Sequence, residues 1–325
     1  MRKIIIDTDP GIDDAFAIIA ALRYKDFDVL GITSVGGNKG LELTTTNSQK
    51  IIEFMNANIK VYPGAKEPLD NRNKLSMKKT SESGDEIHGK DGLGNVNLTF
   101  DDNVSLGNKN AVDFILEQAR VYKGELEIIT LGPLTNIATA INTDKETMKG
   151  VKAIYSMGGG INKFNRPGNS EFNYFFDPLA VKIVYDFGKF ADIHMIGLDV
   201  THKCIFTIED LFFFGEELGA TGKLLSHMAN VYLKAYWREY KYLGVVIHDL
   251  LTVLYAIDQS ICPVDSKVSL YVVTEDKNNG QTVIDSKNEF KNAFVPQLID
   301  VKRAKNLFVE LIDKKKLDLY KKHFN

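Results

Sequence analysis

The sequence predicts an α/β protein with a doubly wound, mainly parallel central sheet, flanking helices and a helical C-terminal portion. Short apolar runs alternate with longer helical patterns through the first two thirds of the chain, which is the rhythm of repeated βα units. The last third is richer in helical patterns. The chain has 325 residues, 44% of them apolar, without an internal repeat or a low-complexity linker, so we expect one domain over residues 1–325.

Six apolar runs have the length of strands, and they cover residues 4–6, 29–35, 60–62, 127–131, 153–157 and 192–196. The helical patterns between them cover residues 13–24, 42–57, 111–122, 134–141 and 178–187. The later part predicts helices over 208–218, 221–240 and 247–257, a strand over 268–274 and a closing helix over 301–314. Residues 70–102 are polar and contain glycine, which predicts a long loop, and such loops are often functional.

Composition excludes several classes of protein. The net charge is −3 and no run of basic residues follows a helix face, so we expect no nucleic-acid partner. No apolar stretch has the length of a membrane span and the N-terminus lacks a signal-peptide layout, which predicts a cytoplasmic protein with no membrane partner. Two cysteines provide no disulfide framework.

Four aspartates lie within residues 7–14, and no lysine or arginine separates them. Asp7 and Asp9 are two positions apart at the end of a strand, so they share a direction, whereas Asp13 and Asp14 open the following helix. Apolar residues flank the cluster on both sides, which predicts burial. Like charges packed so closely resist ionisation unless a cation shares the site, so the cluster indicates a metal site.

Other polar signals occur at places where predicted strands end, namely residues 35–38, 131–136, 157–160 with 171–173, and 248–249. Ligands of open α/β sheets bind outside the carboxyl ends of the strands, so these signals and the aspartates predict one pocket. Carboxylate and carbonyl oxygens without clustered cysteine or histidine indicate calcium or magnesium. Three candidate carboxylates and a strand-end carbonyl favour calcium. Neighbouring asparagines suit a sugar with several hydroxyls, and attack of water on its anomeric carbon would be glycoside hydrolysis.

These residues resemble a known family. The segment DTDPGIDDA at residues 7–15 is similar to the N-terminal signature of the inosine-uridine-type nucleoside hydrolases. Further motifs follow in the family's order: VGGN at 35–38, HG at 88–89, GPLTN at 132–136, EFN at 171–173, DP at 177–178, DVTH at 199–202 and HD at 248–249. The resemblance covers most of the chain. It implies a nucleoside hydrolase-like fold and calcium-dependent cleavage of ribonucleosides, of the inosine/uridine type or accepting pyrimidines, to ribose and free base.

The resemblance also implies roles for single residues. Calcium would be bound by Asp9, Asp14 and Asp249 and by the main-chain carbonyl of Leu131. Asp9 would also be the general base for the attacking water, with Asp7 as a support behind it. The ribose hydroxyls would be held by Asp13, Asn38, Asn165, Glu171, Asn173 and Asp249, of which Asn165 and Glu171 face the 5′-hydroxyl.

On the side of the nucleobase, His248 corresponds to the proton donor of the pyrimidine-accepting and nonspecific branches. His88, Phe172, Tyr236 and Tyr240 would line the base pocket. The aromatic residues between 232 and 242 have partly helical spacing, so they are either core or a stacking wall for the base. For His202 a structural role is expected. The family resemblance further implies a homodimer or homotetramer that acts in nucleoside salvage.

Three alternatives stay open at this stage. Lys163 and Arg166 depart from the family pattern and bring positive charge near the expected 5′-hydroxyl, which suggests a 5′-phosphorylated or modified nucleoside as substrate. A magnesium-dependent phosphatase of the haloacid-dehalogenase type would use Asp7 and Asp9, but it has no use for the later motifs. A ribose-binding protein without catalysis would not need a metal-binding carboxylate paired with a general base.

Overall fold

The computed structural model describes residues 1–70, 85–100, 106–264 and 266–324. Its centre is a six-stranded sheet in the order β3-β2-β1-β4-β5-β6, and every pairing in it is parallel. The strands are β1 Arg2–Thr8, β2 Phe27–Ser34, β3 Val61–Pro63, β4 Leu126–Thr130, β5 Ala153–Met157 and β6 Asp192–Ile196. The predicted fold class is confirmed.

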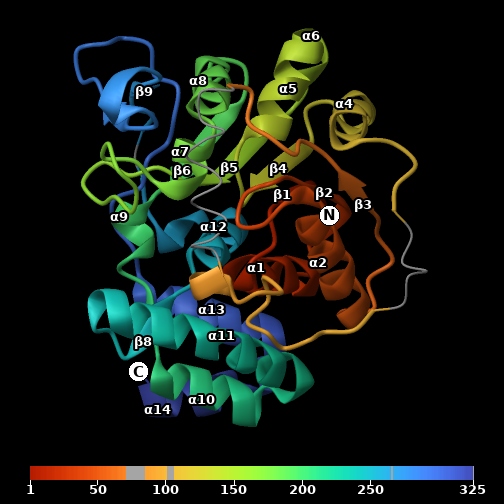
Figure 1. Cartoon of the computed structure of the whole chain (residues 1–325), viewed down its shortest axis with the longest axis vertical. Coiled ribbons are helices and arrows are strands. Elements are labelled where there is room, and N and C mark those ends of the chain that lie inside the picture. The colour runs from red at the N-terminus through yellow and green to blue at the C-terminus, as the bar shows by residue number, and fades with distance from the viewer. Residues whose placement is uncertain (71–84, 101–105, 265, 325) are drawn as a thin grey trace.

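Two apolar cores cover the two faces of the sheet, because alternate residues of each strand point to opposite sides. In β1, Ile4 and Ile6 join the core with α1, α2, α11, α12 and α13, whereas Ile5 faces α4, α5 and α8. Figure 1 shows these two groups of helices on either side of the sheet. The helices named here are α1 Ile12–Arg23, α2 Leu41–Phe54, α4 Ala111–Val121, α5 Thr135–Thr143, α8 Pro178–Asp186, α11 Gly219–Tyr240, α12 His248–Ile257 and α13 Val301–Asp313.

The C-terminal portion is helical, as predicted. It adds α10 Ile208–Glu217 and α14 Leu317–Phe324 to α11 and α13, and the four helices gather on one side of the molecule in Figure 1. A small antiparallel pair, β7 Ile205–Thr207 with β8 Gly244–Val246, lies with these helices, whereas a second pair, β9 Leu270–Val272 with β10 Thr282–Ile284, lies near α8 (Figure 1). Short helices α6 Lys145–Met148, α7 Phe172–Phe176 and α9 Leu198–Thr201 complete the connections of the sheet.

Several predicted boundaries were wrong. The helix expected to reach residue 57 ends at Phe54, because Asn56 adopts a left-handed conformation with φ of 51° that stops the helix. The strand expected over 268–274 is only Leu270–Val272. Of the predicted loop over 70–102, residues 71–84 and 101–102 lie outside the described part, and residues 85–88 form one helical turn.

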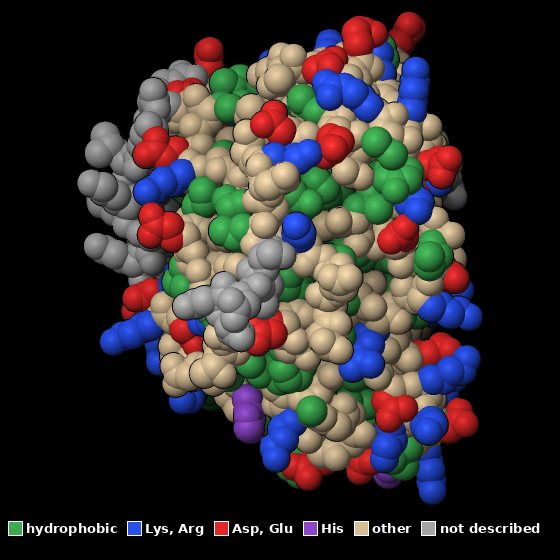
Figure 2. Space-filling view, turned by 90° about the vertical axis from the view of Figure 1, so that its right-hand side faces the viewer, with side chains coloured by type: hydrophobic (Ala, Val, Ile, Leu, Met, Phe, Trp, Pro, Cys, Tyr) green, Lys and Arg blue, Asp and Glu red, His purple; other side chains and the backbone are tan. Residues whose placement is uncertain are grey.

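The surface is of mixed charge. On the face shown in Figure 2, acidic and basic side chains are interspersed with apolar ones. This distribution agrees with the small net charge of −3. In the described ranges, no helix combines the length and the apolar character that crossing a bilayer requires.

Phe308 provides a test of how the C-terminal helices are held. Its ring is fully buried and lies with its centroid 5.8 Å from that of Phe16 and 5.2 Å from that of Phe214, so it joins α13 to α1 and α10. We expect Phe308→Ala to lower the free energy of unfolding by about 3–5 kcal/mol, because it leaves a cavity. Phe212→Ala on the solvent side of α10, where the ring is 70% exposed, should change it by about 0.5 kcal/mol or less. If urea denaturation showed the same loss of unfolding free energy for Phe308→Ala and Phe212→Ala, this role of Phe308 would be contradicted.

Candidate functional site

The sheet places the aspartate loop at the point where its strand order reverses. β1 and β4 are adjacent, and their helices leave toward opposite faces, so a crevice opens beyond the carboxyl ends of these two strands. Asp9 follows β1, and Leu131 follows β4. The amide of Leu131 donates a hydrogen bond of 2.7 Å to the carbonyl of Asp7, which keeps the two strand ends together.

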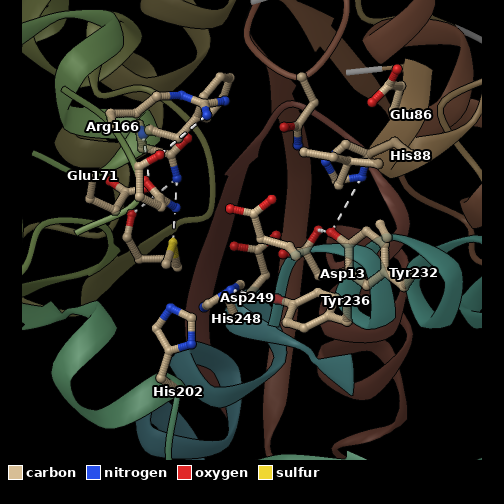
Figure 3. A pocket seen from close by; sticks show the side chains of 18 of the residues that line it. Asp13, Glu86, His88, Arg166, Glu171, His202, Tyr232, Tyr236, His248 and Asp249 are labelled. Atoms are coloured by element: carbon tan, nitrogen blue, oxygen red, sulfur yellow. Dashed lines mark hydrogen bonds between the residues drawn. The ribbon is translucent and has the colours of Figure 1, made fainter. Parts of the chain in front are cut away.

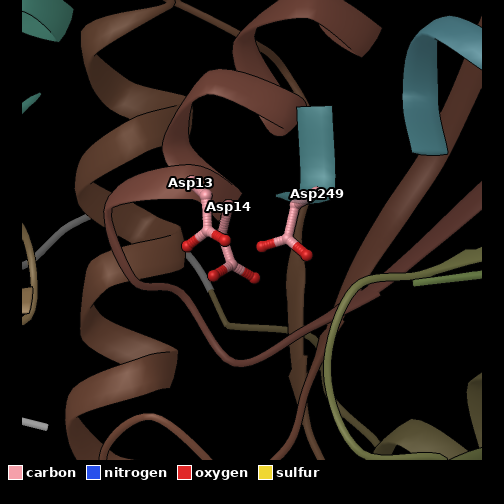
Figure 4. A group of neighbouring side chains, drawn as sticks. All are labelled: Asp13, Asp14 and Asp249. Atoms are coloured by element: carbon pink, nitrogen blue, oxygen red, sulfur yellow. The ribbon is translucent and has the colours of Figure 1, made fainter. Parts of the chain in front are cut away.

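Three carboxylates converge beside this crevice. Asp13 and Asp14 come from the first turn of α1 and Asp249 from the first turn of α12, and each offers an oxygen within 4.8 Å of the others. Figure 4 shows the three side chains pointing into one space. All three are buried. The packing of α12 against α1 therefore brings a carboxylate to the cluster from 235 positions further along the chain.

Asp9 lies next to this group and is fully buried. Its Oδ2 accepts a hydrogen bond of 2.6 Å from the amide of Asn38, whereas its Oδ1 has no hydrogen-bond partner. A Cβ at Gly37 would lie 2.0 Å from Oδ2 of Asp9, and one at Gly132 would lie 2.5 Å from Oδ1. Glycine is required at both positions because the carboxylate occupies the space of a side chain.

Burial raises the pKa of each carboxyl group in the aspartate cluster. For Asp13 burial and then the charge of Asp14 raise the pKa to about 7, and for Asp9 burial followed by the same neighbour raises the pKa well above its ordinary value. The pKa of Asp249 is likewise raised by burial and then by Asp13 and Asp14. These oxygens, including the unpartnered Oδ1 of Asp9, fit a hard divalent cation, since its charge would offset the repulsion.

Asp7 occupies a different position. Its Oδ1 accepts hydrogen bonds from the hydroxyl of Thr33 and, at 2.8 Å, from the side-chain amide of Asn136. The donors belong to β2 and α5, so Asp7 lies behind the cluster, as the family resemblance implies.

A cavity of about 370 Å³ opens above the cluster, a size that suits a small organic ligand. Of the fourteen residues predicted for the site, twelve line this cavity: Asp13, Asn38, His88, Leu131, Asn165, Glu171, Phe172, Asn173, Tyr236, Tyr240, His248 and Asp249. Asp9 and Asp14 do not line it, because both are fully buried beneath it. Asn38 connects the cavity to the aspartates beneath it, since its side-chain amide donates to Oδ2 of Asp14 at 3.3 Å.

One wall of the cavity comes from the segment between β5 and α7. Both carboxylate oxygens of Glu171 accept backbone hydrogen bonds, Oε1 from the amide of Asn173 at 2.9 Å and Oε2 from that of Gly159 at 3.0 Å. Asn173 in turn donates to the carbonyl of Leu131 at 2.8 Å. Glu171 is thus the cap of α7 as well as a wall of the cavity. Asn165 has a buried Oδ1 without a partner.

The opposite wall is aromatic and contains histidine (Figure 3). The Nδ1 of His88 accepts a hydrogen bond of 3.2 Å from the amide of Ile12, so the helical turn at 85–88 rests directly on the aspartate loop. Burial, followed by the charges of Lys39 and Arg166, lowers the pKa of His88 to about 3. His88 is therefore a neutral hydrogen-bonding group in this structure.

His248 is held between two hydroxyl groups. Its Nδ1 lies 2.8 Å from Oγ1 of Thr201, and its Nε2 lies 2.9 Å from the hydroxyl of Tyr236. Burial, followed by the charges of His202 and His88, lowers its pKa well below the ordinary value. The ring is therefore neutral, and it donates through one nitrogen and accepts through the other.

Nine residues that line the cavity are not among the fourteen predicted ones, and among these nine Tyr232, His202 and Arg166 contact predicted residues. The hydroxyl of Tyr232 donates to Oδ1 of Asp13 at 2.7 Å, so this ring belongs to the site rather than to the core alone. His202, for which a structural role was expected, lines the cavity with its ring centroid 5.2 Å from that of His248. Arg166 lines it as well, whereas Lys163 is exposed and does not. Tyr232 and Tyr236 are four positions apart on α11, a spacing that could have indicated a shared face.

Comparisons with known proteins agree with this geometry. The profile of the family described as inosine-uridine preferring nucleoside hydrolase matches residues 4–307. The "Probable uridine nucleosidase 2" of Arabidopsis thaliana is 38% identical over 80% of this chain and 79% of its own. The pyrimidine-specific ribonucleoside hydrolase RihB of Escherichia coli is 32% identical over 86% of this chain and 84% of its own. The solved purine-preferring ribonucleoside hydrolase of Gardnerella vaginalis superimposes with a TM-score of 0.86 at 29% identity, covering 96% of this chain and 98% of its own.

The raised pKa values make stability depend on pH and on a cation. Asp13 has a pKa of about 7 in the fold, above the value of about 3.9 expected when unfolded. Its protonation therefore favours the metal-free fold below about pH 4, and this contribution is lost as the pH rises through about 7. In the presence of a chelator we expect the Tm to fall between pH 5 and pH 8, and calcium should raise it more at pH 8, where fewer protons compete.

Asp249→Asn tests whether calcium binds at this cluster, because the substitution removes one carboxylate charge at nearly constant side-chain volume. We expect it to reduce the calcium-dependent rise in Tm at pH 8 by scanning calorimetry. A rise that is equal at both pH values, or equal in the variant, would show that calcium binds elsewhere.

Proposed function

Because this chain belongs to the inosine-uridine preferring nucleoside hydrolases, enzymes that hydrolyse the N-glycosidic bond of nucleosides, we propose that it cleaves ribonucleosides with the help of bound calcium. The single observation that supports the metal is the set of buried carboxylates of Asp9, Asp13, Asp14 and Asp249, with no lysine or arginine paired to any of them in the described ranges. Irregular sets of several protein oxygens suit calcium better than magnesium, which keeps more of its water.

In this proposal calcium is held by Asp9, Asp14 and Asp249 and by the carbonyl of Leu131. Asp13, which the structure places within 4.8 Å of Asp14 and Asp249, is an additional candidate ligand. When bound, the cation would lower the pKa of a coordinated water and so supply hydroxide at neutral pH.

Asp9 is the proposed general base. The amide of Asn38 orients its carboxylate through Oδ2, and Oδ1 is left without a partner to receive a proton from the attacking water. Burial and the charge of Asp14 raise the pKa of Asp9, which makes the carboxylate a stronger base. Gly37 and Gly132 leave room for the Asp9 carboxylate, because a Cβ at either position would overlap it.

The ribose would lie on the floor and the wall of the cavity. Asp13, Asn38, Asn173 and Asp249 offer oxygens and amides to the 2′- and 3′-hydroxyls, and Asn165 and Glu171 face the 5′ end. The hydroxyl of Tyr232 fixes the orientation of the Asp13 carboxylate, so one of its oxygens is left for the sugar. This lining favours ribonucleosides over deoxyribonucleosides.

His248 is the proposed proton donor to the leaving base. Burial lowers the pKa of His248, and its two nitrogens lie against the hydroxyls of Thr201 and Tyr236, so a proton that His248 passes to the base can be replaced from either hydroxyl. Tyr236 and Tyr240 on α11, with His88 and Phe172, form the surrounding base pocket. The two relatives whose names state pyrimidine nucleosides support a preference for uridine, although a purine-preferring enzyme shares the fold.

Family membership favours hydrolysis over the phosphatase and the non-catalytic binding protein considered from the sequence. A cytoplasmic location, nucleoside salvage and a homodimer or homotetramer stay predictions.

Asp9→Asn tests the general base. We expect kcat for uridine to fall by roughly 100- to 10,000-fold, since the amide cannot take the proton. The measurement is release of ribose in the presence of calcium, and a chelator should abolish it in the wild type. Asp192→Asn, at the exposed start of β6, should leave kcat unchanged. Activity retained in Asp9→Asn would refute the assignment.

His248→Ala tests the proton donor. We expect a loss of roughly 100-fold or more in kcat for uridine, whose base needs a proton to leave, and a much smaller loss for an aryl riboside with an activated leaving group. His323→Ala in the exposed turn of α14 serves as the control. If both substrates lost activity equally, His248 would act in folding or binding instead.

A further inference from the structure

Arg166 is a cation that the proposed reaction does not use, and it lines the same cavity. Its guanidinium carbon lies 4.8 Å from the ring centroid of Phe172, a contact that positions the side chain along the wall. Figure 3 shows Arg166 beside Glu171, across the cavity from Tyr232 and His88.

The donors of this guanidinium are almost entirely unused. Its Nη1 donates a hydrogen bond of 3.3 Å to the carbonyl of the adjacent Asn165, and the buried Nε has no partner among the described residues. No carboxylate of the described residues lies within ion-pair distance of it. A guanidinium presents five N–H donors in a planar fork that matches phosphate or carboxylate. Leaving such a group unpaired is costly, so an anionic ligand is the natural partner.

Burial lowers the pKa of Arg166 and the nearby charge of Glu171 raises it in part, but the two described side chains form no ion pair. The backbone amides of Gly159, Asn173 and Tyr174 already donate to both oxygens of Glu171. The charge of Arg166 also acts across the cavity, where it contributes, after burial and Lys39, to the lowered pKa of His88.

The segment that carries Arg166 is firmly built. The backbone amide of Arg166 donates to the carbonyl of Ser170 at 3.0 Å, which closes a tight turn. Asp199 accepts hydrogen bonds from the amides of Ile161 and Asn162, at 2.6 and 2.9 Å, and so anchors the start of the segment to α9. The guanidinium is therefore presented at a fixed place, as selective recognition requires.

The position of Arg166 relative to the proposed substrate follows from the other walls. A ribose on Asp13, Asn38 and Asp249, with its base toward His88, Tyr236 and His248, leaves its 5′ carbon facing the wall that contains Asn165, Arg166 and Glu171. We propose that Arg166 binds an anionic group on the 5′ carbon and that the substrates include nucleoside 5′-monophosphates. This proposal rests on the proposed function.

The reaction with such a substrate is balanced without a further reactant. The oxygen of water forms the new bond to C1′ while the bond from C1′ to the base nitrogen breaks and its electron pair goes to the base. One proton of the water is taken by Asp9, and the base receives a proton through His248 from the neighbouring hydroxyls of Thr201 and Tyr236. Solvent then carries the proton of Asp9 back to these donors, so that no proton is gained or lost. The products are free base and ribose 5-phosphate, and the phosphate ester remains intact.

The test compares uridine with uridine 5′-monophosphate in calcium-containing buffer. For the wild type we expect kcat/KM to be at least tenfold higher for the monophosphate. In Arg166→Met, which keeps the contact with Phe172 but loses the charge, kcat/KM for the monophosphate should fall roughly 100-fold. The readout is the ratio of kcat/KM for the monophosphate to kcat/KM for uridine. Arg166→Lys should restore this ratio in part, because a lysine keeps the charge but lacks the planar set of paired N–H donors.

Lys163→Met is the matched control, since Lys163 is an exposed cation of the same segment that does not line the cavity; it should leave the ratio unchanged. Binding of ribose 5-phosphate and of ribose, measured by titration calorimetry, tests the inference independently of turnover. We expect ribose 5-phosphate to bind at least tenfold more tightly than ribose, and we expect this difference in affinity to vanish in Arg166→Met.

The outcomes separate the two proposals. If uridine is cleaved but the monophosphate is a poorer substrate, and the ratio does not change in Arg166→Met, the inference on Arg166 is overturned while the proposed function stands. If neither substrate is cleaved, the proposed function fails, and calorimetry with ribose 5-phosphate still decides whether Arg166 binds an anion. Equal weakening of both sugars in Arg166→Met would overturn the inference, because it would mean that Arg166 recognises the uncharged ribose.

Discussion

The repulsion among buried carboxylates at the end of β1 is the constraint on which the site depends. Asp9, Asp13, Asp14 and Asp249 share a small volume from which water is largely removed, and burial raises the pKa of each. Backbone amides and hydroxyl groups compensate only part of this charge, because Oδ1 of Asp9 lacks any partner. The fold can tolerate such a group of acids only with protons or a cation among them.

Many features of the surroundings follow from this constraint. Glycines stand at positions 37 and 132 because the Asp9 carboxylate fills the space where a Cβ would lie. Burial lowers the pKa of all three histidines that line the cavity, His88, His202 and His248, which favours their neutral forms. They therefore act as directional donors and acceptors rather than as counter-charges, which leaves the acidic cluster available for a metal ion.

The two walls of the cavity come from different parts of the fold. The wall with Glu171 is rigid because backbone amides fix the carboxylate, and the same bonds cap α7. The aromatic wall comes from α11, which the C-terminal helices hold through the large core on that face of the sheet. The wall with Glu171 is thus tied to the sheet, whereas the aromatic wall is tied to the helical portion.

The sequence by itself determined the fold class and most of the site. Alternating apolar runs specify parallel βα units, and the ends of such strands necessarily share one edge, so Asp9, Asn38, Leu131 and Asn173 could be placed together before any coordinates were known. Their motifs also carried the family resemblance, which the comparisons confirm.

Only the tertiary structure decided contacts that depend on packing between distant helices. It added Asp13 to the carboxylates that could ligate a cation with Asp14 and Asp249, and it turned Tyr232 of α11 toward Asp13. It also separated Arg166, which lines the cavity, from Lys163, which does not. Local patterns specify which face of an element is apolar, but the direction of a single polar side chain is set by the neighbours that enclose it.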